Sequence, residues 1–196
     1  MVVKIAAALG MARLMACSLA VQAQQPAAGD GPRYSGTALM RPSEYREWVF
    51  LSSGLGMNYN APAPGAPPPA RQSFTNVFVN PSSYRSFMQT GKWPDKTVLV
   101  LEIRASSGNG SINKDGRFQT TLSGMEVHVK DSRFANGWAF FGFGGGKESA
   151  EPMAGQAVAE CVTCHADQGA VDNTFAQFYP TILDTARQKG TLRAGF

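Results

Sequence analysis

Side-chain patterns of period two and short apolar runs mark four stretches of the chain as β-strands. In the clearest stretch, residues 97–104, Glu102 falls on one face with the valines, whereas Leu101 falls on the other. Gly124 interrupts the third stretch and predicts a bend or a bulge. The predicted strands are residues 74–79, 97–104, 118–130 and 138–143. Strands of this kind, separated by turn residues, are typical of an antiparallel sheet.

Helical spacing and helix-end signals predict helices before, between and after these strands. Residues 42–51 have Ser43 as a suitable N-cap and an apolar face that includes Trp48. Asn80-Pro81 is a cap followed by a proline at the first helical position, and Gly91 ends that helix. One further helix follows Pro152 and carries residues 161–165, and a last helix covers residues 180–188. The expected fold is therefore α+β, with an antiparallel sheet of about four to five strands packed against a few helices.

Two segments of biased composition interrupt this pattern. Residues 24–40 begin with a stretch rich in Gln, Ala, Pro and Gly, and we expect a flexible N-terminal tail there. Residues 60–70 are dominated by proline and alanine, which predicts an extended loop inserted within one domain. The predicted domain covers residues 41–190, and the chain contains no internal repeat.

The first 23 residues have the features of a secretory signal peptide. Lys4 and Arg13 supply positive charge, residues 14–21 are apolar, and Ala23 ends a small-residue cleavage site. Lipidation of Cys17 is the alternative, although the apolar sequence that continues past it favours simple cleavage. We therefore expect a periplasmic protein.

Charge and hydropathy exclude two classes of partner. The predicted leader contains 2 of the 18 basic residues, which leaves 16 basic and 14 acidic residues in the rest of the chain. This balance is too even for a nucleic-acid-binding surface. After the leader, no apolar run approaches the roughly 18 residues that a membrane span requires.

The clearest chemical motif is Cys161-Val162-Thr163-Cys164-His165. C-x-x-C-H is the attachment signature of a c-type haem, in which the two thiols bond the vinyl groups and the histidine coordinates the iron. The alternatives are a redox dithiol and a pair of inert buried thiols. Cys161 and Cys164 are the only cysteines after the leader, which leaves no other disulfide partner. We expect one covalent haem c, with His165 as its iron ligand.

The position of this motif bears on the second axial ligand. Small electron-transfer cytochromes usually supply a methionine downstream of the motif, but Met153, the last methionine here, precedes it. His128 is the only other histidine, and its place on a strand is more typical of a surface or packing residue. An open, five-coordinate iron is therefore favoured over a simple electron-transfer site.

Seven segments of the chain also occur together, in this order and spacing, in a known family. They are Tyr45 to Val49, Phe74 to Tyr84, Thr90 to Glu102, Gly124 to Asp131, Gly137 to Phe143, Cys161 to His165 and Phe175 to Pro180. In these segments the chain resembles the cytochrome P-460 family, which includes the cytochromes c′-beta. The resemblance implies a periplasmic homodimer in which a sheet covers the distal side of a five-coordinate haem c.

The family has two branches, and they differ at positions that this sequence contains. In the branch that oxidises hydroxylamine to nitrous oxide, a lysine cross-links to the haem, and Leu101 occupies the matching position. Leu101 has no amine, so the chain resembles more closely the c′-beta branch, which binds nitric oxide in an apolar distal pocket. Glu126 matches a distal carboxylate that transfers protons in the hydroxylamine branch. The alternative is a solvated glutamate on a strand or a salt bridge with Lys130 or Arg117.

These features lead to two main hypotheses. The first is a haem c protein that binds nitric oxide or a related small nitrogen-oxide ligand. The second is a hydroxylamine oxidoreductase with Glu126 as the proton relay. A simple electron-transfer cytochrome is a third hypothesis, and the redox partner is not predicted.

Overall fold

The computed structural model describes residues 29–57, 63, 65 and 72–196. The predicted leader over residues 1–23 and most of the predicted loop over residues 60–70 lie outside the described residues. Among the described residues, no helix is both long enough and apolar enough to cross a bilayer.

An antiparallel sheet of five strands forms the centre of the described structure, in the order β3-β4-β5-β6-β7. Every strand pairs with its neighbour along the chain, so the sheet is a meander. A second sheet of three short strands has the order β1-β2-β8. The strands are β1 (Tyr34–Ser35), β2 (Ala38–Met40), β3 (Val49–Leu55), β4 (Phe74–Val79), β5 (Val98–Ser107), β6 (Phe118–Lys130), β7 (Trp138–Gly142) and β8 (Ser149–Ala150). The α+β fold class is thereby confirmed.

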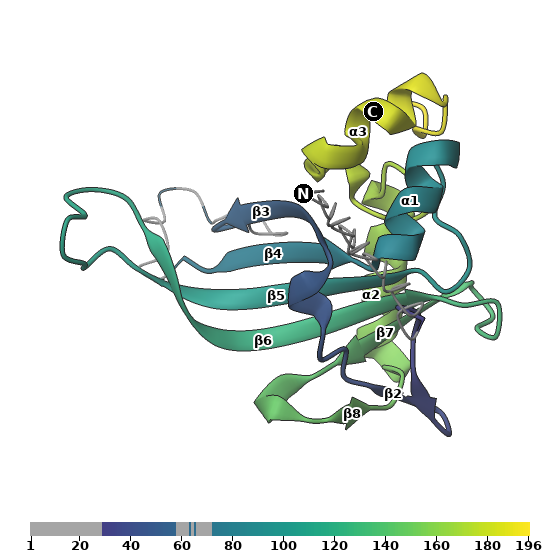
Figure 1. Cartoon of the computed structure of the whole chain (residues 1–196), viewed down its shortest axis with the longest axis horizontal. Helices are drawn as coiled ribbons and strands as arrows, with labels where there is room; N and C mark the ends of the chain where they lie inside the picture. Colours follow the sequence, from purple (N-terminus) through teal and green to yellow (C-terminus); the bar gives the residue numbers. More distant parts are fainter. Residues whose placement is uncertain (1–28, 58–62, 64, 66–71) are drawn as a thin grey trace, which may run out of the picture.

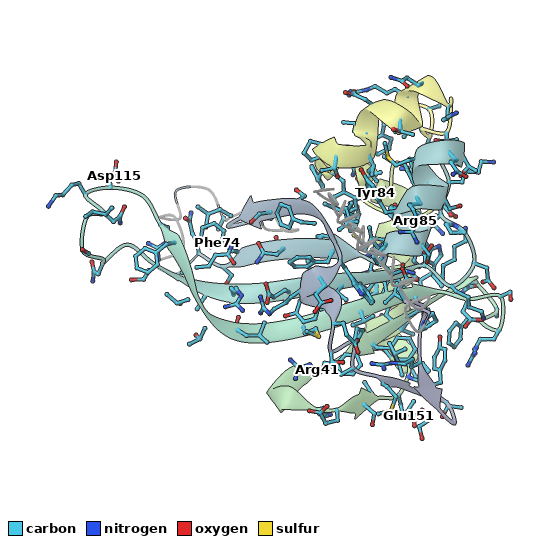
Figure 2. All side chains as sticks on the ribbon, viewed as in Figure 1. Arg41, Phe74, Tyr84, Arg85, Asp115 and Glu151 are labelled. Atoms are coloured by element: carbon cyan, nitrogen blue, oxygen red, sulfur yellow. The ribbon has the colours of Figure 1, made fainter. Side chains whose placement is uncertain are left out.

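The helices gather over one end of the five-stranded sheet, and the β5–β6 hairpin extends away from them at the opposite end (Figure 1). They are α1 (Pro81–Thr90), α2 (Gly155–Gln168) and α3 (Pro180–Gln188), with short 3-10 turns η1 (Tyr45–Glu47), η2 (Gly144–Gly146) and η3 (Ala176–Phe178). Figure 2 marks the two ends of the sheet: Asp115 lies at the hairpin tip, and Tyr84 and Arg85 lie on α1.

The two faces of the sheet bury different groups of residues. One face packs against the helices, and its core includes Leu99, Phe87 of α1 and Ile182 of α3. The other face packs against η1 and the small sheet, and its core includes Val100 and Leu39. Residues that alternate along β5 thus serve two separate cores, as the period-two pattern predicts.

Two predictions near the N-terminus were wrong. Residues 42–51 do not form a helix, because only η1 is helical and β3 begins at Val49. Val49 and the two residues after it are β-branched, aromatic or aliphatic, and pairing with β4 outweighs the local helical pattern. The predicted tail is also shorter than residues 24–40, because β1 and β2 lie within it and Leu39 is fully buried.

The other predicted elements are present, with small shifts at their ends. The four predicted strands correspond to β4, β5, β6 and β7, and the bulge predicted at Gly124 lies beside it, where the register shifts between Ile103 and Arg104. Helix α1 begins at Pro81 and ends at Thr90, and its C-cap Gly91 has a left-handed φ of 72°. Its cap differs from the prediction, because Asp30 Oδ2 accepts the Ser82 N–H at 2.6 Å while Asn80 makes no capping bond.

The C-terminal end of the chain holds α2 in place. The Arg193 guanidinium donates hydrogen bonds to the carbonyl oxygens of Ala166 and Asp167 in the last turn of α2. A cation at this end also interacts favourably with the helix dipole. The packed structure therefore continues past residue 190, the predicted end of the domain.

A buried carboxylate lies on the face of the sheet opposite the helices. The side chain of Glu102 is 1% exposed. It accepts hydrogen bonds from Tyr45 Oη at 2.7 Å, Arg104 Nη2 at 3.0 Å and Asn76 Nδ2 at 2.9 Å, and Arg46 also pairs with it. Burial raises the pKa of Glu102, but the hydrogen bonds from Arg104, Asn76 and Tyr45 outweigh burial and hold it at about 2.

This pKa predicts a pH-dependent contribution to stability. Because the pKa falls from 4.5 in the unfolded chain to about 2, the contribution is present above about pH 4.5 and is lost as the pH falls toward 2. We expect Glu102→Gln to lower the free energy of unfolding at pH 7 by about 3 kcal/mol. Urea unfolding at several pH values checks this, and the difference from wild type should narrow below pH 4.5. Glu148→Gln, at an exposed position, is the control and should show no such pH dependence.

Candidate haem site

Helix α2 presents all three residues of the C-x-x-C-H motif. Cys161 and Cys164 are one turn apart, which places both thiols on the same side of the helix. Both are free and partly exposed, so the fold does not support the alternative of a buried, inert pair of thiols. Burial, and after it the Glu126 carboxylate, raise the pKa of the Cys161 thiol. The thiols are therefore accessible, and Cys161 is protonated at neutral pH.

The imidazole of His165 is held by three aromatic rings and one hydrogen bond. Its ring centroid lies 4.4 Å from that of Phe175, 4.8 Å from that of His128 and 5.1 Å from that of Phe140. Its Nδ1 lies 2.8 Å from the carbonyl oxygen of Asn173, so the Nδ1–H donates to this oxygen. Burial lowers the pKa of His165. The neutral ring then has an unprotonated Nε2, the form that coordinates a metal.

A tight turn supplies the carbonyl oxygen that accepts from His165. Thr174 N donates to Val171 O at 2.8 Å, and the two residues between them, Asp172 and Asn173, have φ values of 49° and 58°. Positive φ at both central positions is the geometry of a type I′ turn, for which Asp and Asn are suited. Gly169 allows the turn to lie against the end of α2. A Cβ at this position would lie only 2.5 Å from the main-chain oxygen of His165.

The sheet places the predicted distal residues in one row beside this histidine. Leu101 pairs with Glu126 across β5 and β6, so their side chains lie on the same face. His128 pairs with Phe140 in the next row, and both rings contact His165. Leu101 packs against the core beneath the helices. Leu101 and Glu126 thus lie one row away from the ring contacts of His165.

A comparison with known protein families decides the classification. The model of the family described as Cytochrome P460 matches residues 42–176. The chain belongs to this family. The match contains the motif, Leu101, Glu126 and the turn at Asn173, and membership implies a haem cofactor. No curated protein matches the chain.

The donor set fits the haem cofactor of the Cytochrome P460 family. Cys161 and Cys164 are free thiols on one side of α2, as covalent attachment requires. His165 has its Nδ1 occupied by a backbone carbonyl, the usual outer partner of a metal-bound histidine, which leaves Nε2 for iron. The cavity against the inner side of the ring is only about 20 Å³, enough for about one water. The ring of His165 therefore has little room to move toward the sheet.

Glu126 has the surroundings of a proton-transfer group. Its side chain is 49% exposed, and partial burial raises the pKa of its carboxyl. The Oε2 atom lies 4.0 Å from His128 Nε2. Burial, and next the proximity of His165, lower the pKa of His128 to about 3, so His128 is neutral and Glu126 has no cationic partner there.

The salt bridges considered for Glu126 from the sequence do not form. Lys130 instead pairs with Asp172 in the turn after α2. The Arg117 Nε donates to Ser106 Oγ at 2.8 Å. The carboxylate of Glu126 is therefore not engaged by either base.

The structure also contains site residues that the sequence did not reveal. The most important is Asn173, which contributes a main-chain oxygen and therefore has no side-chain signature. The adjacent pair Asp172-Asn173 is a turn signal that could have been recognised, since both residues tolerate left-handed backbone. Of the two roles expected for His128, surface or packing, the structure shows packing, because its ring lies between those of Phe140 and His165.

Proposed function

We propose that the chain is a periplasmic mono-haem c-type cytochrome whose five-coordinate iron binds nitric oxide or a related small nitrogen-oxide ligand. Cys161 and Cys164 form the covalent bonds to the haem, and His165 Nε2 coordinates the iron. When bound, the haem supplies the iron that takes up the diatomic ligand. The observation that carries the proposal is Leu101, an apolar side chain in the row beside His165.

The arrangement of His128 supports an open sixth position. A simple electron-transfer cytochrome would need a second side chain that is free to ligate the iron. The ring of His128 is in edge-to-face contact with that of His165 at 4.8 Å and with that of Phe140 at 4.5 Å. His128 is therefore held by the rings of Phe140 and His165 and is not presented as a second ligand. This disfavours the simple electron-transfer cytochrome, which needs two axial ligands.

Glu126 favours a second candidate function, the oxidation of hydroxylamine to nitrous oxide. A carboxylate with a raised pKa accepts a proton from a bound N–H or O–H group near neutral pH. Against this function, the position of the cross-linking lysine is Leu101. Its neighbours in the same row of the sheet are Val77, Glu126 and Gly142, none of which carries an amine.

Anaerobic turnover distinguishes the two functions. The purified haem protein is incubated with hydroxylamine and an electron acceptor, and nitrous oxide in the headspace is measured. Binding of nitric oxide to the reduced protein, with no nitrous oxide from hydroxylamine, supports the first proposal. Nitrous oxide production that Glu126→Gln abolishes would establish the second. A Soret band of the reduced protein displaced strongly to the red would indicate a modified macrocycle and would contradict the role given to Leu101.

Localisation and assembly complete the proposal. We propose export to the periplasm with removal of residues 1–23, and a homodimer as in the family it resembles. N-terminal sequencing of the mature protein tests the first, and an N-terminus at Cys17 would indicate the lipoprotein instead. Light scattering coupled to size-exclusion chromatography tests the second.

A further inference from the structure

The carbonyl oxygen that accepts from His165 is attached to the sheet by an ion pair. Lys130, near the end of β6, pairs with Asp172, the residue before Asn173 in the turn. The two side chains are 25% and 29% exposed. An ion pair that is mostly shielded from water is screened less than one on the open surface. It therefore connects the turn to the strand that also carries Glu126 and His128.

A second set of contacts converges on the same turn. Lys130 Nζ also donates to the carbonyl oxygen of Trp93 at 2.8 Å. The buried indole of Trp93 in turn donates from Nε1 to Thr174 Oγ1 at 2.9 Å. Lys130 thus contacts the turn directly, through Asp172. It also contacts Trp93, whose indole holds Thr174 at the end of the turn.

We propose that Asp172 and Lys130 are positioning residues for the axial ligand. Their ion pair holds the Asn173 carbonyl against His165 Nδ1 and so sets the reduction potential of the haem. The inference rests on the proposed ligation of haem by His165.

The physical link runs through the basicity of the imidazole. A hydrogen bond from Nδ1–H to a carbonyl makes the ring a stronger donor to the metal. A stronger donor favours the ferric state and lowers the potential. The turn needs support, because Asp172 and Asn173 both have left-handed backbone, which is unfavourable unless the surroundings hold it. Without the ion pair, the turn relaxes and the hydrogen bond to His165 weakens.

The test uses the holoprotein with each partner replaced in turn. Asp172→Asn removes the charge and keeps a residue that tolerates positive φ, and Lys130→Met removes the cation. We expect both variants to raise the midpoint potential and to lower the iron–histidine stretching frequency in resonance Raman spectra of the ferrous protein. A tenfold change in the equilibrium between ferric and ferrous protein corresponds to about 59 mV for this one-electron couple. Lys130→Arg keeps the cation and should restore values near wild type.

The sign of the two shifts separates positioning from a simple charge effect. Through space, loss of the Asp172 charge would raise the potential and loss of the Lys130 charge would lower it. Shifts of the same sign, with a double variant that changes no more than the larger single variant, support the inference. Shifts of opposite sign overturn it, as do unchanged potentials and unchanged stretching frequencies.

Two further variants complete the experiment. Asp184→Asn breaks the exposed pair with Arg187 on α3 and is the matched control, with no change expected in either measurement. His165→Ala tests the ligation on which the inference rests. If His165→Ala left the ferrous spectrum unchanged, the ligation in the proposed function would fail, and the inference with it. If His165→Ala changes the spectrum while Asp172→Asn and Lys130→Met have no effect, only the inference fails.

Discussion

Replacement of His165 by alanine is expected to abolish the native iron ligation while leaving the haem covalently attached. In the proposed attachment, Cys161 and Cys164 form the covalent bonds, and both lie on α2 independently of the imidazole. The ferrous absorption spectrum should therefore change, and the iron–histidine stretching band should disappear. A haem stain of the denatured protein on a gel should remain positive, although attachment is expected to be less efficient.

His128, the other histidine of the chain, could compensate for this loss. Its ring contacts that of His165, so a cavity left by His165→Ala lies beside it. The double variant His165→Ala/His128→Phe removes this route and retains an aromatic ring against Phe140. Added imidazole should restore a five-coordinate spectrum in both variants. A wild-type spectrum for His165→Ala/His128→Phe would show that neither histidine is the ligand.

The strands could be predicted because their pattern is local and the fold enforces it. Along β5, Val98 and Val100 enter one core and Leu99 the other, and Glu102 falls on the valine side as expected. The ends of α1 were equally clear, since Pro81 and Gly91 each satisfy a requirement of the backbone at that point. In these segments, propensity and tertiary packing favour the same structure.

The errors near the N-terminus occur where propensity and packing disagree. The residues from Tyr45 to Val49 have helical spacing, but Tyr45 is 4% exposed because its hydroxyl reaches Glu102 on β5, 57 residues away. The chain then continues directly into β3 to complete the sheet. Contacts over such sequence distances leave no local signature. The burial of Leu39 against the sheet face opposite the helices has none either.

The same distinction between local patterns and long-range contacts applies to the residues of the candidate site. The motif from Cys161 to His165 is contiguous, so helix α2 alone brings its residues together. The placement of Glu126 and His128 on one face also follows from their spacing, and it is confirmed. By contrast, the pairing of Leu101 with Glu126 depends on sheet register, and the bond from His165 to Asn173 depends on a turn with left-handed residues. Neither feature can be predicted from periodicity.

Leu101→Ala is expected to accelerate the binding of nitric oxide and carbon monoxide to the ferrous protein. Leu101 lies in the row beside His165. In its proposed distal role, its isobutyl group occupies volume that an incoming ligand must displace. If that displacement costs about 1.4 kcal/mol, its removal speeds association about tenfold. The variant should also lose about 2 kcal/mol of stability, the lower end of the range for leucine truncation, because Leu101 is only partly buried. Flash photolysis measures the association rates, and urea unfolding measures the stability.

Val100→Ala provides the matched control for this prediction. Val100 is adjacent to Leu101 on β5 and fully buried, but its side chain enters the core on the opposite face of the sheet. Truncation there should lower stability and leave both association rates at the wild-type values. A general loosening of the sheet would accelerate binding in both variants, whereas a distal role for Leu101 accelerates it only in Leu101→Ala. If Leu101→Ala binds both gases at the wild-type rates, Leu101 does not line the ligand site, and the observation that carries the proposed function is lost.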